Sequence, residues 1–179
     1  MLFRSVCASD GLSVNADHGI ADERALGALD AVIVCGGLRI EQNTSRPVLN
    51  WLRRVQQRGL GLGATCTGSY VLARAGLLDG YRCSIHWENM AALTDQFPAV
   101  TVSRSIFTID RNRYTSSGGI APVDMMLHFV SAQCGSKVSA GIAEQFIYER
   151  IRQPDDHQRM PLKHVVGGQS SKLVIAVEL

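Results

Sequence analysis

Short apolar runs alternate with helical stripes through the first half of the chain. Residues 31–35 and 60–65 are apolar without polar alternation, which indicates strands covered on both faces in a parallel sheet. Between them, Pro47 in a first turn and an apolar stripe predict a helix that ends at Gly59. A second helix is expected over residues 69–78. The order strand, helix, strand, helix favours right-handed crossovers in an open sheet with helices on both faces.

The rest of the chain gives weaker but readable signals. A strand over residues 2–8 and an extended piece over 12–16 flank a turn and predict a hairpin, and Asp22 is a candidate cap for a short helix reaching Leu29. Residues 153–169 are polar, with two prolines and a glycine pair, and are predicted to be a linker. The remaining expected elements are strands at 83–86, 100–102, 107–109 and 114–115 and helices at 88–97, 122–135, 138–147 and 173–179, the last capped by Ser170 or Ser171.

Composition narrows the class of protein. The 179 residues are 46% hydrophobic and 19% charged, so one globular domain fits and disorder does not. The net charge is +2 with no block of like charge, so charge alone does not predict nucleic-acid binding. No apolar run approaches the length of a membrane span, and no signal peptide is visible. Five widely spaced cysteines without a Cys-x-x-Cys pair indicate reduced thiols in the cytoplasm, and no metal or cofactor is expected.

The most informative position is Cys66, where a buried strand runs directly into a helix. Ala64 and Gly68 supply the small side chains that a tight nucleophile elbow requires. The start of the following helix is expected to favour the thiolate of Cys66. A small buried cysteine at a tight crossover is the competing interpretation, and the sequence leaves both open.

Three other segments are expected to meet Cys66 at the carboxyl edge of the sheet. His86 ends the next strand and is the nearest candidate base, although a partly buried imidazole capping the next helix is an equally good interpretation. Glycine pairs follow two other strands, and their bare N–H groups could hold an oxyanion or carboxylate. Each glycine pair alone most often marks a turn, but their convergence on one cysteine predicts a pocket for a small polar ligand. The candidate ligand-binding residues are Gly36, Gly37, Cys66, Thr67, His86, Trp87, Gly118 and Gly119.

Taken together, six motifs resemble the ligand-sensing domain of GlxA-type AraC-family transcription regulators. They are Val34-Cys35-Gly36-Gly37, the Cys66 elbow, residues 73–80, His86-Trp87-Glu88, Ile109-Asp110-Arg111, and Ser117-Gly118-Gly119 with Asp124-Met125-Met126. That domain is part of the class I glutamine amidotransferase-like superfamily, which includes PfpI-type proteases and isocyanide hydratases. The resemblance implies a flavodoxin-like α/β three-layer sandwich with a mostly parallel sheet. It also implies a cytoplasmic bacterial homodimer that senses a small metabolite, in relatives often an amino acid or a quaternary amine.

The sequence also differs from the family pattern in three places. PfpI-type enzymes carry a His directly after the nucleophilic Cys, and Thr67 stands here instead. Residues 1–152 are expected to form the sensor domain without the family's first βα unit. Residues 153–179 are expected to be a linker and the start of a truncated helix-turn-helix region, so DNA would be bound only through a part that this chain lacks.

Two main hypotheses follow. In the first, the chain is a non-enzymatic sensor, in which Thr67 and backbone N–H groups hold the anionic end of a ligand and Trp87 stacks on a cationic end. In the alternative, it is a cysteine-dependent amidase or hydratase with Cys66 as nucleophile and His86 as base. A dimerisation module with a vestigial pocket is a third possibility.

Overall fold

The computed structural model describes residues 4–8, 11–22, 26–27, 29–42 and 44–159. The predicted helix over 173–179 and the predicted linker beyond residue 159 lie outside the described residues. So do Ser9 and Asp10 of the first turn and most of the short helix expected after Asp22. Within the described ranges, no helix combines the length and the apolar character needed to cross a bilayer.

A four-stranded sheet forms the centre of the molecule. Its strands are β3 (Ala31–Cys35), β4 (Gly61–Thr65), β8 (Arg113–Ser116) and β7 (Phe107–Asp110), in that spatial order. The β3–β4 and β4–β8 pairs are parallel, whereas β7 and β8 form an antiparallel hairpin at the edge. The parallel register sets the last residues of β3, β4 and β8 side by side, so the loops that follow these strands leave the sheet at one edge.

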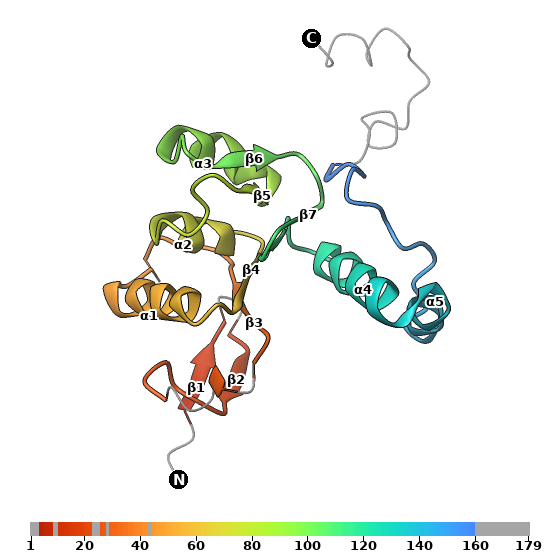
Figure 1. Cartoon of the computed structure of the whole chain (residues 1–179), viewed down its shortest axis with the longest axis horizontal. Coiled ribbons are helices and arrows are strands. Elements are labelled where there is room, and N and C mark those ends of the chain that lie inside the picture. The colour runs from red at the N-terminus through yellow and green to blue at the C-terminus, as the bar shows by residue number, and fades with distance from the viewer. Residues whose placement is uncertain (1–3, 9–10, 23–25, 28, 43, 160–179) are drawn as a thin grey trace, which may run out of the picture.

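Helices cover both faces of this sheet, as Figure 1 shows. On one side lie α1 (Arg46–Gln57) and α2 (Gly68–Arg74), and on the other lie α4 (Ala121–Cys134) and α5 (Ser136–Gln145). The first face is sealed by fully buried leucines from α1, β4 and α2, and the second by Phe107 and Met125. The predicted three-layer α/β sandwich with a mostly parallel sheet is confirmed.

Smaller elements flank the central layers. The predicted hairpin is present as β1 (Arg4–Cys7) and β2 (Ser13–Ala16), which pair antiparallel. A second two-stranded sheet pairs β5 (Arg82–Ser84) in parallel with β6 (Thr101–Ser103). The 3₁₀ helix η2 (Trp87–Asn89) and α3 (Met90–Gln96) lie between those two strands. Buried hydroxyls attach β5 to the central sheet, because Ser84 Oγ lies 2.7 Å from Thr108 Oγ1 and Ser84 N donates to Thr115 Oγ1.

Two helices end earlier than the sequence pattern predicts, and both end in the same way. After α2, Leu77 N donates to Leu72 O and Gly76 N to Ala73 O, with Gly76 at φ 72°, which is a Schellman motif. After α5, the N–H of Tyr148 and of Ile147 bond in the same pattern. The predicted helix over 138–147 is therefore wrong at its end: Phe146 and Ile147 lie outside it, 73% and 93% exposed.

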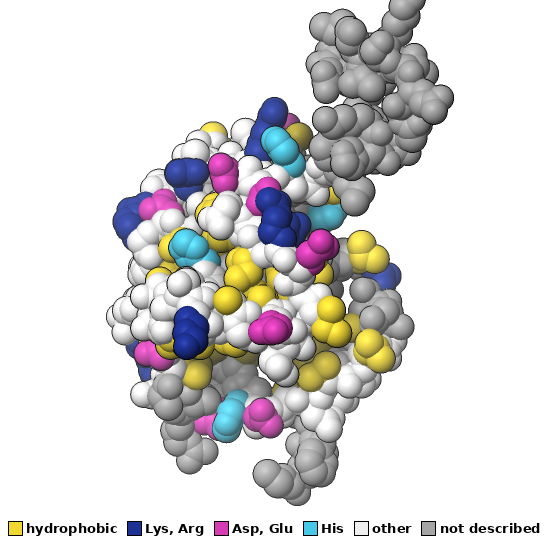
Figure 2. Space-filling model, turned by 90° about the vertical axis from the view of Figure 1, so that its right-hand side faces the viewer, with side chains coloured by type: hydrophobic (Ala, Val, Ile, Leu, Met, Phe, Trp, Pro, Cys, Tyr) yellow, Lys and Arg dark blue, Asp and Glu magenta, His cyan; other side chains and the backbone are white. Residues whose placement is uncertain are grey.

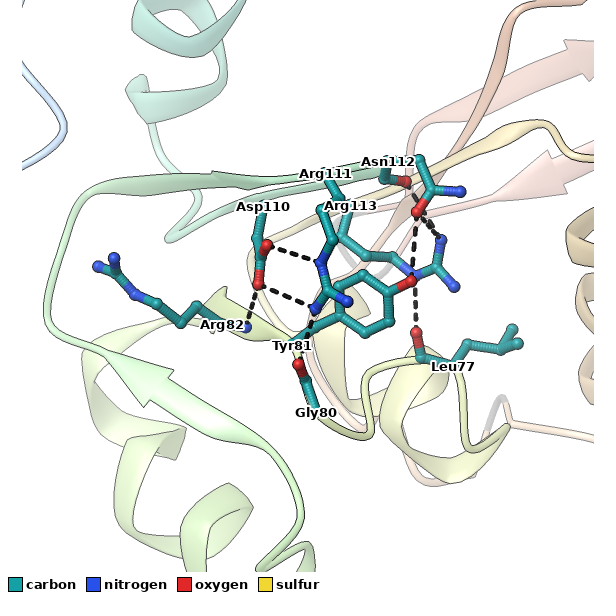
Figure 3. A network of polar contacts seen from close by, with 8 residues as sticks. All are labelled: Leu77, Gly80, Tyr81, Arg82, Asp110, Arg111, Asn112 and Arg113. Carbon is teal, nitrogen blue, oxygen red and sulfur yellow. Dashed lines mark hydrogen bonds and ion pairs between the residues drawn. The ribbon is translucent and has the colours of Figure 1, made fainter.

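The edge of the sheet opposite the Cys66 turn is held by a polar network that Figure 3 shows. Arg113 is 1% exposed; its Nε donates to Leu77 O at 2.6 Å and Nη1 to Asn112 Oδ1 at 2.9 Å. Arg111 lies over the Tyr81 ring, with its Cζ 3.6 Å from the ring centroid, and donates to Asp110. Burial lowers the pKa of Arg113, while hydrogen bonds from Arg111 and Arg82 lower that of Asp110. The Ile109-Asp110-Arg111 motif thus joins the β7–β8 turn to the start of β5 and is remote from the candidate site.

Candidate functional site

Cys66 occupies a strained turn between β4 and α2. Its φ is 55°, in the left-handed region that a residue with a side chain rarely adopts, and its N–H donates to Ser116 O at 3.0 Å. The side chain is partly exposed. A sharp strand-to-helix turn thus presents the thiol at the carboxyl edge of the sheet, as the small flanking residues predict.

The glycine loops meet at this turn, and contact distances show why they are glycine. A Cβ on Gly118, whose φ is 92°, would lie 2.7 Å from Cys66 Cβ and 3.1 Å from its Sγ. On the other side, a Cβ on Gly36 would lie 2.0 Å from Gly68 N. Thr67 Oγ1 donates to Gly37 O at 2.6 Å, so this hydroxyl holds the first glycine loop against the turn. The predicted convergence of the two glycine loops on the Cys66 turn is therefore present.

A cavity of about 190 Å³ lies on the Gly118 side of the turn. Four of the eight candidate residues line it, namely His86, Trp87, Gly118 and Gly119. The other four, Gly36, Gly37, Cys66 and Thr67, do not, and Thr67 borders a separate cavity of about 40 Å³. The lining is completed by Ser117, which belongs to the Ser117-Gly118-Gly119 motif, and by residues that the sequence did not single out: Ile106, Ile120, Ala121, Arg152 and Gln158.

His86 lies at this cavity and pairs with an acidic neighbour instead of the cysteine. Its Nδ1 is 3.6 Å from Glu88 Oε2, and its ring lies 5.6 Å from that of Trp87, centroid to centroid. Across the described part of the chain, no hydrogen bond joins His86 to Cys66. The structure thus forms a cysteine turn and a histidine beside a cavity without the direct contact of a nucleophile and base.

One wall of the cavity comes from residues 148–159, which we call the strap. The strap is pinned to α4 by Asp124, a carboxylate with 0% exposure. Asp124 accepts hydrogen bonds from Tyr148 Oη at 2.8 Å, Arg152 N at 2.8 Å and Arg152 Nε at 2.9 Å. Burial and the bond to Asp124 raise the pKa of Tyr148. A buried carboxylate paired in this way holds its partners firmly, because leaving the charge alone would be costly.

Beyond this pin, the strap follows the start of β7. Ile106 N donates to Pro154 O at 3.0 Å, and Gln158 Nε2 donates to Ser105 O at 2.9 Å. An isolated antiparallel bridge also pairs Ser105 with His157. At its end, the Arg159 guanidinium lies 4.6 Å from the centroid of the Trp87 ring. The strap is thus docked against α4 and the start of β7, and its residues Arg152 and Gln158 form one wall of the cavity.

Two polar atoms of the strap are buried without a hydrogen-bond partner, and both belong to residues that line the cavity. One is Gln158 Oε1. The other is Arg152 Nη2, which forms an ion pair with Asp124 Oδ2 at 2.7 Å. Such atoms are rare in folded proteins and call for an explanation. In the described ranges, no group of three or more His, Cys, Asp or Glu side chains is placed to hold a metal ion.

Sequence reasoning missed the strap because its polar composition is equally typical of a linker. Asp124 was noted only as part of a motif. A stronger signal was available. Asp124 is the only acidic residue in the expected apolar helix over 122–135, and Tyr148 and Arg152, later in the chain, have side chains that can donate hydrogen bonds to a carboxylate. A buried carboxylate needs such partners.

Comparison with known proteins supports the resemblance inferred from the motifs. The model of the DJ-1/PfpI family matches residues 4–132. The HTH-type transcriptional regulator GbdR of Pseudomonas aeruginosa is 52% identical over 98% of this chain and 47% of its own length. GlxA of Rhizobium meliloti, also named an HTH-type transcriptional regulator, is 31% identical over 97% of this chain and 53% of its own. The chain therefore spans about half the length of these relatives.

A solved structure gives the same result in three dimensions. The crystal structure of an AraC family transcriptional regulator from Pseudomonas putida is 33% identical, with a TM-score of 0.69. The match covers 79% of this chain and 75% of the other. The predicted likeness to GlxA-type and AraC-family regulators is confirmed.

Proposed function

The chain belongs to the DJ-1/PfpI family, and from this premise we propose that it is the ligand-sensing part of an AraC-family transcription regulator. A small amino acid or quaternary amine binds in the cavity beside the Cys66 turn and controls DNA binding by another part of a longer protein. The observation that carries this proposal is the composition of the cavity wall. The family core supplies Gly118 and Gly119, and the strap supplies Arg152 and Gln158.

This arrangement supplies a physical route for signalling. A ligand that touches both the core and the strap binds the docked strap better than an undocked one, so it shifts the population toward docking. Since the strap ends at residue 159, its docking fixes where the following part of the chain begins. The relatives, named as HTH-type regulators and about twice as long, support this direction of coupling.

Thermal unfolding of the chain with amino acids and methylated amines tests the proposal. A ligand present at about 100 times its Kd adds about 2.7 kcal/mol to stability. For a chain of this size, that corresponds to a rise in Tm of about 5–11 °C. Acetate and propionate, which carry no amine, serve as matched controls. If no amino acid or methylated amine raises Tm at millimolar concentration, the sensing role is wrong.

The strained turn at Cys66 favours one second candidate, a cysteine-dependent amidase or hydratase. Its φ of 55° is the geometry of a presented nucleophile. Against it, the described residues show no base bonded to the thiol, and Thr67 stands where PfpI-type enzymes carry His. Alkylation by iodoacetamide near pH 7 separates the two, with the exposed Cys7, Cys35 and Cys134 as internal controls. Faster reaction at Cys66 than at all three would favour the enzyme.

We further propose that the protein is a cytoplasmic homodimer that pairs through the face of α4 and α5. Figure 2 shows apolar side chains gathered on this side of the molecule. The exposed apolar residues of the two helices and the turns beside them are Ile120, Val123, Met126, Val138, Phe146 and Ile147. An apolar patch of this kind is typical of a protein interface. Sedimentation of Met126→Glu should show a monomer, whereas Val14→Glu on the hairpin should leave the dimer intact.

A further inference from the structure

We propose that residues 170–179, which we call the tail, dock as a short helix in an open groove beside α5. The inference does not depend on the ligand. It goes beyond the proposed function because it gives the segment that follows the strap a binding site on the body of the same chain. Two observations carry it: the groove is apolar with an acidic rim, and the tail is apolar with a basic start.

The floor of the groove is apolar. It is a hollow of about 730 Å³, and its floor is lined by Ala140, Ala143, Ile147, Tyr148 and Ile151. Ala140 and Ala143 are three residues apart, so they lie on the same side of α5 and leave room for a neighbouring helix to approach. The hydroxyl of Tyr148 is already bonded to Asp124, which leaves the ring to line the groove. This floor therefore fits an apolar segment.

The rim of the groove is acidic. Glu144 and Glu149 line it, and both side chains are exposed. Within the described ranges, neither carboxylate forms an ion pair with a Lys, Arg or His side chain. Charge complementarity therefore favours an occupant that carries a basic residue beside its apolar part.

The tail has the matching pattern. The sequence predicts a helix over residues 173–179, and the run from Leu173 to Val177 is apolar without interruption. A helix this short is not stable alone in water, and a helix that is apolar on all sides is typically buried. Lys172 directly precedes the run. The tail thus needs an apolar surface to pack on, and its basic start matches the acidic rim.

The linker is long enough for the tail to reach the groove. The strap leaves the groove at Ile151, and its described part ends eight residues later at Arg159, a separation of at most about 29 Å. Residues 160–169 can extend to about 33–36 Å. The chain can therefore return from the end of the strap to α5.

The groove and the proposed dimer face lie on different sides of α5. Each residue turns a helix by about 100°, so Ala140 lies about 160° around the α5 axis from Val138 of the dimer face. Ile147 borders both surfaces. A docked tail therefore leaves most of the dimer face accessible.

Digestion of the full chain with a protease that cuts only after lysine tests the docking. The lysines of the chain are Lys137 at the start of α5, Lys163 in the predicted linker and Lys172 at the start of the tail. Each cleavage rate is followed by mass spectrometry and divided by the rate at the same site in the urea-unfolded chain. Cleavage after Lys172 should be at least about tenfold slower than cleavage after Lys163, because the protease cuts only the undocked tail.

Substitutions in the groove locate the protection. Ala140→Arg fills the groove and repels the basic start of the tail, so cleavage after Lys172 should rise to within about threefold of cleavage after Lys163. Ala91→Arg is the matched control, since Ala91 is an exposed alanine of α3 that does not line the groove. It should keep the wild-type difference.

Neutralising the rim tests the charge argument. Glu144→Gln combined with Glu149→Gln should raise the rate of cleavage after Lys172 by about twofold or more, because surface ion pairs contribute little each. In every variant, a cut after Lys137 would report unfolding of α5 itself, so the rates are compared only where that site stays uncut. An unchanged rate in the double variant would overturn the basic-to-acidic match.

Each remaining outcome also decides the inference. Equal cleavage after Lys163 and Lys172 in the wild-type chain overturns it, and this comparison needs no variant. Protection that persists in Ala140→Arg overturns the groove as the docking site. Protection that is lost in the monomeric Met126→Glu variant, with Lys137 uncut, shows that the groove holds the tail of a second copy instead. None of these results changes the expected effect of amino acids on Tm, so the proposed function is tested separately.

Discussion

Replacing Gly118 with alanine tests whether the cavity loop is packed against the Cys66 turn as closely as the structure shows. The new methyl group would lie 2.7 Å from Cys66 Cβ, a distance that real side chains essentially never show, and 3.0 Å from its Cα, which is also unusually close. The residue also has a φ of 92°, a conformation that favours glycine.

The magnitude follows from these two effects. A left-handed backbone costs a non-glycine residue about 1–2 kcal/mol. Overpacking against a neighbour that cannot retreat costs about 1–3 kcal/mol more, and Cys66 is fixed by its own bond to Ser116 O. We therefore expect Gly118→Ala to lower the free energy of unfolding by about 2–5 kcal/mol.

Gly119 offers a matched control one residue away. It also has a positive φ, of 58°, but an added Cβ there meets no atom within 4 Å. Gly119→Ala should therefore carry only the backbone cost of about 1–2 kcal/mol. The effect of alanine on the unfolded chain is the same at both positions, so the difference of about 1–3 kcal/mol isolates the contact with Cys66.

Urea unfolding followed by tryptophan fluorescence gives these free energies. A second variant, Cys66→Gly, removes two of the three close contacts and relieves the turn, whose φ is 55°. Combining it with Gly118→Ala should recover about 1–2 kcal/mol relative to the sum of the single changes. If Gly118→Ala is no more costly than Gly119→Ala, or if the double variant shows no recovery, the close packing of loop and turn is refuted.

Three further outcomes are expected in the same urea assay. Asp124→Asn should cost about 3–5 kcal/mol because it removes the buried carboxylate that pairs with the partly buried Arg152, whereas the exposed Asp155→Asn should stay within about 0.5 kcal/mol. In the monomeric Met126→Glu background, Ile147→Gly should gain about 1 kcal/mol, since Ile147 holds φ 52° at a position that usually carries glycine, and Phe146→Gly, at φ −83°, should gain nothing. Burial raises the pKa of Cys83 from 9.0 to about 12, so the folded chain keeps a proton that the unfolded chain loses. Stability should then fall between about pH 9 and 12, by up to about 1.4 kcal/mol per pH unit, and Cys83→Ala should flatten that slope; an equal slope in both would contradict it.

Elements set by local signals could be predicted from the sequence. Pro47 marks the start of α1 because its ring-locked φ acts within one turn; Ser45 is the N-cap residue by position, and its side chain makes no cap hydrogen bond. The Cys66 turn was predicted because only small residues fit beside it. The pairing of β4 with β8, rather than with the next strand along the chain, was not predicted. That choice depends on contacts between residues about 50 positions apart, which no local pattern reports.

The residues of the cavity also divide into those that local patterns predict and those that depend on contacts distant in the sequence. His86 and Gly118 were found because each follows the carboxyl end of a strand. Their strands, β5 and β8, belong to different sheets but lie side by side, with Ser84 N bonded to Thr115 Oγ1. Gly36 and Thr67 were also placed at that edge correctly, yet they bond to each other's loops and leave the cavity to other residues. Arg152 and Gln158 could not be found in this way. Their position depends on one buried carboxylate, Asp124, which lies 28 residues before Arg152.

The position of Asp124 decides how ligand binding and strap docking depend on each other. It lies in the first turn of α4, directly after the Gly118–Gly119 loop that borders the cavity. A ligand held between that loop and Arg152 therefore bridges the same two elements that Asp124 already joins. Its binding free energy adds to the docking of the strap, about 2.7 kcal/mol at 100 times Kd, which changes the ratio of docked to undocked strap by about 100-fold. A ligand that touched only the Cys66 turn would leave that ratio unchanged, however tightly it bound.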